Sequence, residues 1–228
     1  MSAVLYSFRR CPYAIRARYT LATLMLRVEI REVVLKHKPA ALLALGGRST
    51  VPQLLVDGDR FPESLDIIFW ALKTSSNDDL VNQLWPTDPI VRAKIMSWIR
   101  FNDYCFKPWL DRYKYADRHP EQSESYYRDK GERFLKRLDT RLKHSTNLLG
   151  EQMTIADIAI FPFIRQFAGV NASWFEGSGY VYLQEWLNRI LKSECFETVM
   201  VKLTAWDESQ EVSYFPEPRR AQELLIQN

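Results

Sequence analysis

Apolar and polar positions in the first 75 residues alternate between a strand period and a helix period. Residues 3–8 form a short run of strand-forming side chains, and residues 28–35 alternate and are β-branched. Between them, residues 13–26 place apolar side chains at roughly helical spacing, and Pro12 suits the first turn of that helix. A strand, a helix and a second strand in this order predict a right-handed βαβ unit with a parallel strand pair.

The pattern then predicts a short helix, a hairpin and a third helix. Residues 39–45 are interpreted as the short helix, which two glycines end. Residues 53–56 and 60–62 flank an Asp-Gly turn, which is typical of a β-hairpin. Residues 64–72 have helical spacing, with Ser64 as a candidate N-cap. The predicted order is therefore βαβαββα.

Beyond this unit the periodicity becomes wholly helical. The clearest amphipathic segments are residues 90–104, 125–142, 155–167 and 180–191. Thr154 to Asp157 fits the pattern of a helix-capping box, which is interpreted as a helix start without a catalytic role. The sequence predicts three parts: an α/β domain at residues 1–75, a linker at 76–88, and an all-helical domain with a C-terminal tail at 89–228.

Composition narrows the class of protein. Hydrophobic residues make up 46% of the chain and the net charge is only +3, with basic and acidic residues interleaved. A nucleic-acid partner is not expected, because such proteins show a clustered basic excess. No secretory signal and no membrane-spanning run of apolar residues is recognised. The odd number of cysteines does not form a disulfide framework, which favours the reducing cytoplasm.

Cys11 is the sharpest chemical signal. It follows the first predicted strand and precedes Pro12, so it stands at the N-terminus of a helix, where main-chain N–H groups stabilise a thiolate. Arg9, Arg10 and Arg16 lie close in sequence and would add positive potential, so we expect a depressed pKa for Cys11. No second cysteine follows three positions later, which leaves a mixed disulfide with an external thiol, or attack on an electrophile.

Four short motifs in this order resemble the thioredoxin-fold domain of the glutathione transferases, above all their omega-like cysteine class and its bacterial relatives. The motifs are Cys11-Pro12-Tyr13-Ala14, Lys38-Pro39, Thr50-Val51-Pro52 and Glu63-Ser64, and the capping box at Thr154 falls where the second domain of the family has one. The resemblance implies a thioredoxin-like domain followed by a helical bundle, with glutathione as co-substrate. The implied glutathione contacts are Cys11 to the sulfur, Val51 and a cis Pro52 to the cysteinyl unit, Glu63 and Ser64 to the γ-glutamyl end, and Lys38 to the glycyl carboxylate.

Other residues leave alternatives open. Tyr6 and Ser7 stand where some members of the family carry an activating hydroxyl, although Cys11 is preferred. A set of aromatic residues either lines an apolar co-substrate site or takes part in ordinary helix packing. These residues are Tyr13, Tyr104, Phe106, Trp109 and Tyr113. Cys105 and Cys195 are expected to be inert core thiols. The three histidines lack metal-ligand spacing, so no metal is expected.

The preferred function is thiol transfer or reductive deglutathionylation through Cys11, with reduction of the dehydroascorbate type included. Conjugation, isomerisation or dehalogenation of small electrophiles is the first alternative. A non-enzymatic interaction protein on the same fold is the second, since fold does not determine function. The resemblance also implies a homodimer, in which Asp103 either approaches the partner's γ-glutamyl site or is a simple surface acid. A cytoplasmic location and the lack of a membrane partner are expected from the free cysteines and from the missing membrane-spanning run.

Overall fold

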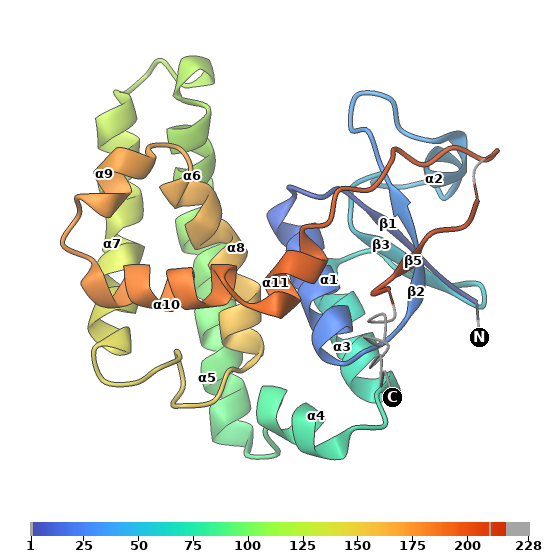
Figure 1. The fold of residues 1–228 in the computed structure, drawn as a ribbon. Coiled ribbons are helices and arrows are strands. Elements are labelled where there is room, and N and C mark those ends of the chain that lie inside the picture. Colours follow the sequence, from blue (N-terminus) through green and yellow to red (C-terminus); the bar gives the residue numbers. More distant parts are fainter. Residues whose placement is uncertain (1, 210, 218–228) are drawn as a thin grey trace, which may run out of the picture.

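A five-stranded mixed sheet organises the N-terminal part of the chain, and helices make up nearly all of the rest (Figure 1). The computed structural model describes residues 2–209 and 211–217 of the 228-residue chain. The strands lie in the order β4-β3-β1-β2-β5. Their bounds are β1 (Ala3–Ser7), β2 (Val28–Glu32), β3 (Gln53–Val56), β4 (Asp59–Phe61) and β5 (Tyr214–Phe215).

The strand pairing confirms the predicted order of elements. β1 runs parallel to β2, with Leu5 opposite Ile30, and antiparallel to β3, with Leu5 opposite Leu54. β3 and β4 form the predicted hairpin around Gly58, whose φ of 100° lies in the left-handed region that glycine adopts without strain. β5 was not predicted: it comes from the C-terminal part of the chain and pairs antiparallel with the outer edge of β2.

Helices cover both faces of the sheet. The bounds of these helices are α1 (Pro12–Thr23), α2 (Ala40–Ala44) and α3 (Ser64–Thr74). α1 and α3 pack against each other and join the main core, whereas α2 contributes Leu42 to a small separate cluster with Tyr6, Val33 and Val51. This second cluster fixes the segment before β3 against β1, next to the loop that carries Cys11.

The segment predicted as a linker contains a helix of its own. α4 (Asp78–Leu84) begins at Asn77, whose side-chain oxygen accepts a hydrogen bond from the Leu80 N–H at 3.0 Å. Asx side chains favour this capping geometry. Asp88 caps the next helix in the same way, with its carboxylate 2.7 Å from the Ile90 N–H.

The C-terminal part is a helical bundle around a buried central helix. Its elements are α5 (Pro89–Arg100), the π-helix η1 (Phe101–Phe106), α6 (Lys107–Lys114), the 3₁₀ turn η2 (Ala116–Arg118), α7 (Glu124–Leu142), α8 (Ile155–Ala168), α9 (Ala172–Glu176), α10 (Val181–Leu191) and α11 (Glu194–Val199). Most side chains of α8 are buried, as expected for a helix that is apolar on all sides. The predicted tail beyond residue 217 lies outside the described residues.

The predicted capping box at the start of α8 is confirmed. The Asp157 carboxylate is fully buried and accepts hydrogen bonds from the Leu148 N–H at 2.9 Å and the Thr154 N–H at 3.0 Å. The Trp186 indole also donates to it, at 3.1 Å. Asp157 therefore joins the start of α8, the preceding loop and α10, a structural role with no exposure to solvent.

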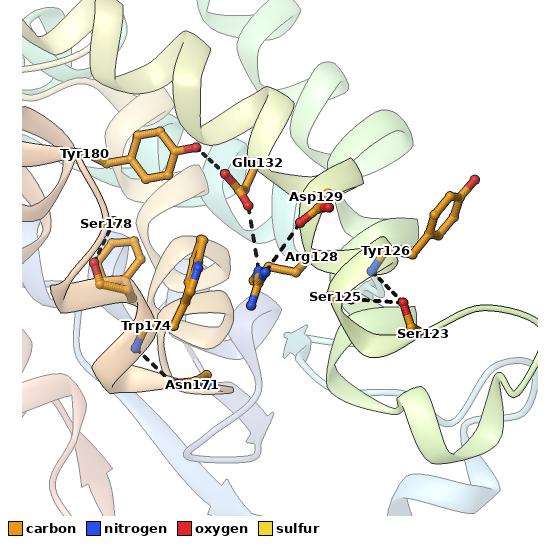
Figure 2. Close-up of polar contacts among 11 residues, drawn as sticks. Ser123, Ser125, Tyr126, Arg128, Asp129, Glu132, Asn171, Trp174, Ser178 and Tyr180 are labelled. Atoms are coloured by element: carbon orange, nitrogen blue, oxygen red, sulfur yellow. Dashed lines mark hydrogen bonds and ion pairs between the residues drawn. The ribbon is translucent and has the colours of Figure 1, made fainter.

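Polar contacts fasten α9 and α10 to the outer face of α7 (Figure 2). The Tyr180 hydroxyl donates to the Glu132 carboxylate at 2.6 Å. Glu132 also lies 3.7 Å from the Arg128 guanidinium, which stacks over the Trp174 ring at 4.7 Å from its centroid. These contacts hold the outer helices in place without a link to the Cys11 loop.

Arg16 joins the two parts of the chain. Its buried guanidinium donates to the Ala159 carbonyl on α8 at 2.6 Å and pairs with the Asp103 carboxylate of η1 at 2.5 and 3.1 Å. It also lies over the Phe163 ring, 4.4 Å from the centroid. The expected positive potential of Arg16 near Cys11 is therefore compensated by Asp103. The approach of Asp103 to a partner's γ-glutamyl site stays a prediction.

Candidate functional site

Cys11 is the N-cap residue of α1, directly after β1. Its main-chain N–H donates to the Phe8 carbonyl at 3.0 Å, which closes the turn between the two elements. The side chain is half-buried, and Sγ donates to the main-chain carbonyl oxygen of Val51 at 3.5 Å. The fold therefore brings together two of the residues with predicted glutathione contacts, although 40 positions separate them in the sequence.

Burial decides the protonation of this thiol. It raises the pKa of Cys11 above its ordinary value, and this effect is larger than the opposing hydrogen bonds from the Ala14 and Tyr13 N–H groups. The Arg18 and Lys107 charges lower the same pKa by smaller amounts. The predicted depression of the Cys11 pKa is therefore wrong: the helix N-terminus and basic residues act in the expected direction, but the loss of hydration outweighs them.

Hydrogen bonds from the Arg18 side chain hold the Cys11 loop in place. This buried guanidinium donates to the Ser7 hydroxyl oxygen and, at 2.5 Å, to the Arg9 carbonyl. The Glu32 carboxylate holds the same loop by accepting from the Arg9 N–H at 2.7 Å. Burial lowers the pKa of Arg18 to about 10, so it stays charged at neutral pH. The sequence analysis missed Arg18, although its position seven residues after Cys11 puts both on one helix face.

The segment before β3 forms one wall of the predicted glutathione site. The Val51–Pro52 peptide bond is cis. Gln53 stabilises the preceding loop, since its side-chain amide donates to the Thr50 carbonyl at 2.7 Å and the Arg48 carbonyl at 2.8 Å. Arg60 on β4 donates to Gln53 at 2.8 Å and to the Leu45 carbonyl at 2.6 Å, which ties the loop to the hairpin.

A shallow depression of about 380 Å³ lies beside this wall. Its lining residues are Gly47, Arg48, Thr50, Arg60, Pro62 and Glu63. Glu63 is the N-cap of α3 and is exposed, while Ser64 is buried at the first turn. Lys38 is not part of this lining; its ammonium group lies 3.3 Å from the Ser49 hydroxyl at the base of the same loop. The predicted binding residues thus surround one loop, with Glu63 closest to the open depression.

A larger cleft of about 1100 Å³ lies between the first part of the chain and the helical bundle. Cys11, Pro12 and Tyr13 belong to its lining. α6 contributes Lys107, Asp111 and Lys114, and α8 contributes Arg165 among others. A molecule in this cleft therefore lies next to Cys11, which does not line the depression at Glu63.

Only one of the aromatic residues proposed for a co-substrate site lines this cleft, namely Tyr13. Phe106 and Tyr113 are buried and pack against Phe167, with ring centroids 5.5 and 4.8 Å away. Trp109 is partly buried against the core, and Tyr104 is 77% exposed. For Phe106 and Tyr113, the alternative of ordinary helix packing is correct. Tyr115, which the sequence analysis did not consider, lines the cleft instead.

Neither alternative hydroxyl is available to a ligand. The Tyr6 hydroxyl is buried and accepts a hydrogen bond from Arg31 at 2.6 Å. The Ser7 hydroxyl is buried and accepts from Arg18. Neither residue lines the cleft or the depression.

The other two cysteines differ from each other. Cys105 lies on the π-helix η1 and is exposed, so its prediction as a core thiol is wrong. The wider turn of a π-helix shifts the positions that follow it around the helix axis, which a regular helical period does not anticipate. Cys195 is partly buried, with its sulfur 3.5 Å from the Thr23 hydroxyl.

The described residues contain neither a candidate metal cluster nor a membrane-spanning helix. No three His, Cys, Asp or Glu side chains in this part of the chain are grouped as metal ligands. No described helix has both the length and the apolar character needed to cross a membrane.

Comparison with known proteins agrees with this geometry. The model of the glutathione S-transferase N-terminal domain matches residues 5–78, and that of the C-terminal domain matches residues 107–189. Glutathione S-transferase U22 of Arabidopsis thaliana is 27% identical over 177 residues, which cover 77% of this chain and 74% of that protein. Glutaredoxin 2 of Escherichia coli is 25% identical over 195 residues, covering 73% of this chain and 87% of the relative.

A solved structure has the same arrangement of domains. It is a glutathione transferase family member from Pseudomonas fluorescens with two glutathione molecules bound, at a TM-score of 0.72 and 22% identity. The alignment covers 87% of this chain and 92% of that one. The two family models together match more than half of the sequence. Residues from both matched segments line the cleft that holds Cys11. The chain therefore belongs to the glutathione S-transferase family of enzymes.

Proposed function

We propose that this protein is a glutathione-dependent thiol transferase in which Cys11 is the nucleophile. The observation that carries the proposal is the position of Cys11, which lines the cleft and whose Sγ lies 3.5 Å from the Val51 carbonyl oxygen. The hydroxyls of Tyr6 and Ser7 are buried and engaged by arginines, so they do not compete for this role. Similarity to glutaredoxin 2 supports thiol chemistry in the same family.

The reaction has two balanced steps. The Cys11 thiolate attacks the glutathionyl sulfur of a mixed disulfide, the S–S bond breaks, and the leaving thiolate takes a proton from water. A glutathione thiolate then attacks the Cys11–glutathione disulfide, which releases glutathione disulfide and restores Cys11. Overall, one mixed disulfide and one glutathione give one free thiol and one glutathione disulfide.

The proposed binding site for the glutathionyl group consists of the wall residues Val51 and Pro52 together with Glu63 and Ser64 at the start of α3. Lys38 lies at the base of the loop. The exposed Glu63 carboxylate suits the α-ammonium of the γ-glutamyl unit, and the first turn of α3 suits its carboxylate. Titration calorimetry with S-methylglutathione is expected to give clearly weaker binding for Glu63→Gln and Ser64→Ala than for the unchanged protein. Glu151→Gln, on an exposed loop of the bundle, serves as the control.

Turnover of the mixed disulfide of glutathione and 2-mercaptoethanol tests the function directly. Cys11→Ser is expected to lose this activity, because a hydroxyl does not form the disulfide intermediate. Cys105→Ser removes an exposed thiol outside the cleft and is expected to keep it. Undiminished activity of Cys11→Ser would overturn the proposal. Activity toward electrophiles but not disulfides would favour conjugation, isomerisation or dehalogenation.

A cytoplasmic location and a homodimer complete the proposal. No disulfide joins the three cysteines, which suits a reducing compartment. Light scattering at micromolar concentration tests the oligomeric state, and a monomer mass would contradict the dimer.

A further inference from the structure

The cleft beside Cys11 carries an excess of positive charge. Its basic lining residues are Arg10, Lys107, Lys114 and Arg165, and its acidic ones are Asp111 and Glu176. Lys107 forms an ion pair with Asp111, so both of these charges are largely compensated. The remaining cations outnumber the remaining acid. A cleft lined mainly by one sign of charge raises the local concentration of ligands of the opposite sign.

Arg165 on α8 is the most buried of the three remaining cations. It is only partly exposed, and it has no carboxylate partner among the described residues. Its guanidinium lies over the Phe196 ring, 5.5 Å from the centroid. Burial, and then the charge of Arg9, lower the pKa of Arg165. A half-buried guanidinium with a second cation near it and no acid beside it loses hydration without gaining an ion pair.

The other two cations without a carboxylate partner among the described residues are exposed. Lys114 is exposed and sits over the Tyr115 ring, 5.0 Å from the centroid. Arg10 is exposed and sits over Phe8, at 5.9 Å. Both residues line the same cleft as Arg165 and Cys11, so their charges act on a ligand that binds there.

We propose that this cleft selects a co-substrate with a negatively charged group, and that Arg165 pairs with that group. The inference rests on the proposed thiol transfer. The substrate class is a glutathione mixed disulfide whose leaving half is a small thiol with a carboxylate. The planar fork of an arginine forms paired hydrogen bonds with a carboxylate, which a neutral or cationic leaving half does not offer.

A charge series on the leaving thiol tests the proposal. The three substrates are mixed disulfides of glutathione with mercaptoacetate, 2-mercaptoethanol and cysteamine, whose leaving halves are anionic, neutral and cationic. For each, kcat/KM is divided by the uncatalysed rate constant with glutathione, which removes the intrinsic reactivity of the disulfide. The unchanged enzyme is expected to rank them anionic, neutral, cationic. Raising the salt concentration from about 0.01 M to about 1 M shortens the screening length from about 30 to about 3 Å and should compress this ranking.

Arg165→Gln is expected to lower the normalised anionic-to-neutral ratio by about tenfold or more, the size typical of a lost charged hydrogen bond. Arg165→Lys keeps the charge and should retain part of the ratio. Arg133→Gln removes the same charge from an exposed position of α7 outside the cleft and is the matched control. An unchanged ratio in Arg165→Gln, or a wild-type ranking that favours the cationic or neutral half, overturns the proposal. A failure of the proposed thiol transfer gives a separate result. In that case the wild type turns over the neutral disulfide no faster than Cys11→Ser does.

Discussion

The Sγ atom of Cys11 donates a hydrogen bond to the main-chain carbonyl oxygen of Val51, at 3.5 Å. Only the protonated thiol can make this bond, and the carbonyl belongs to the segment that leads into β3. When Cys11 is protonated, this contact therefore links the proposed nucleophile to the proposed glutathione-binding wall. Ionisation of the thiol releases the sulfur from this carbonyl.

The first prediction concerns pH. Because burial raises the pKa of Cys11 above its ordinary value of about 8.5, the thiol is protonated at neutral pH and the thiolate appears only at higher pH. The rate of Cys11 alkylation by iodoacetamide should therefore rise with pH through about 8.5 and beyond. The measurement uses a Cys105→Ser background, which removes the exposed thiol. A rate that has already reached its plateau at pH 7 would show that the helix N-terminus outweighs burial.

The second prediction concerns Arg18 as a positioning residue for the Cys11 loop. Arg18→Met removes a charge that lowers the pKa of Cys11, so the midpoint of the alkylation profile should move to still higher pH. The variant also loses the hydrogen bonds to Ser7 and Arg9, and each bond to a charged group contributes about 1.5–3 kcal/mol. Urea unfolding is expected to show a loss of stability of that order.

Arg18→Lys separates the two effects. Lysine keeps the charge but not the fork that reaches both acceptors, so the midpoint should stay near that of the unchanged protein while stability falls. If Arg18→Met destabilised the protein without moving the midpoint, Arg18 would have a structural role alone.

The third prediction concerns Asp157. Asp157→Ala leaves the N–H groups of Leu148 and Thr154 and the Trp186 indole without their buried acceptor. An unsatisfied buried donor costs about 1–3 kcal/mol, so the loss in the free energy of unfolding should reach several kcal/mol. The turnover per folded molecule should stay near that of the unchanged protein, because Asp157 does not line the cleft. A specific loss of activity at unchanged stability would contradict the structural assignment.

The alternation of apolar positions was enough to predict β1 to β4 and α1 to α3, because these elements depend on local periods and turn residues. β5 consists of two residues, Tyr214 and Phe215, whose strand conformation depends on pairing with the distant Val28 and Glu29. Such a short pairing leaves no local pattern in the sequence. α4 was interpreted as part of a linker because its residues are mostly polar, although Asn77 gives it a regular cap.

The site was predicted less completely than the fold. Cys11 and Val51 come together as the motifs implied, but the direction of the Cys11 pKa depends on burial, which a sequence motif does not report. Phe106 and Tyr113 lie on amphipathic helices, and only the packing of those helices decides whether an aromatic face meets a cleft or the core. Arg165 was missed for the same reason, since nothing local distinguishes it from an ordinary helix arginine.

Peptide mapping after exposure to glutathione disulfide tests the central claim most directly. The unchanged protein is treated at a pH near the raised pKa of Cys11, alkylated, digested and analysed by mass spectrometry. The account predicts that one glutathionyl group is added to Cys11 first, that added glutathione removes it, and that blocking Cys11 in advance prevents turnover of the mixed disulfide. Glutathionylation of Cys105 or Cys195 ahead of Cys11, with turnover unaffected when Cys11 is blocked, would contradict it.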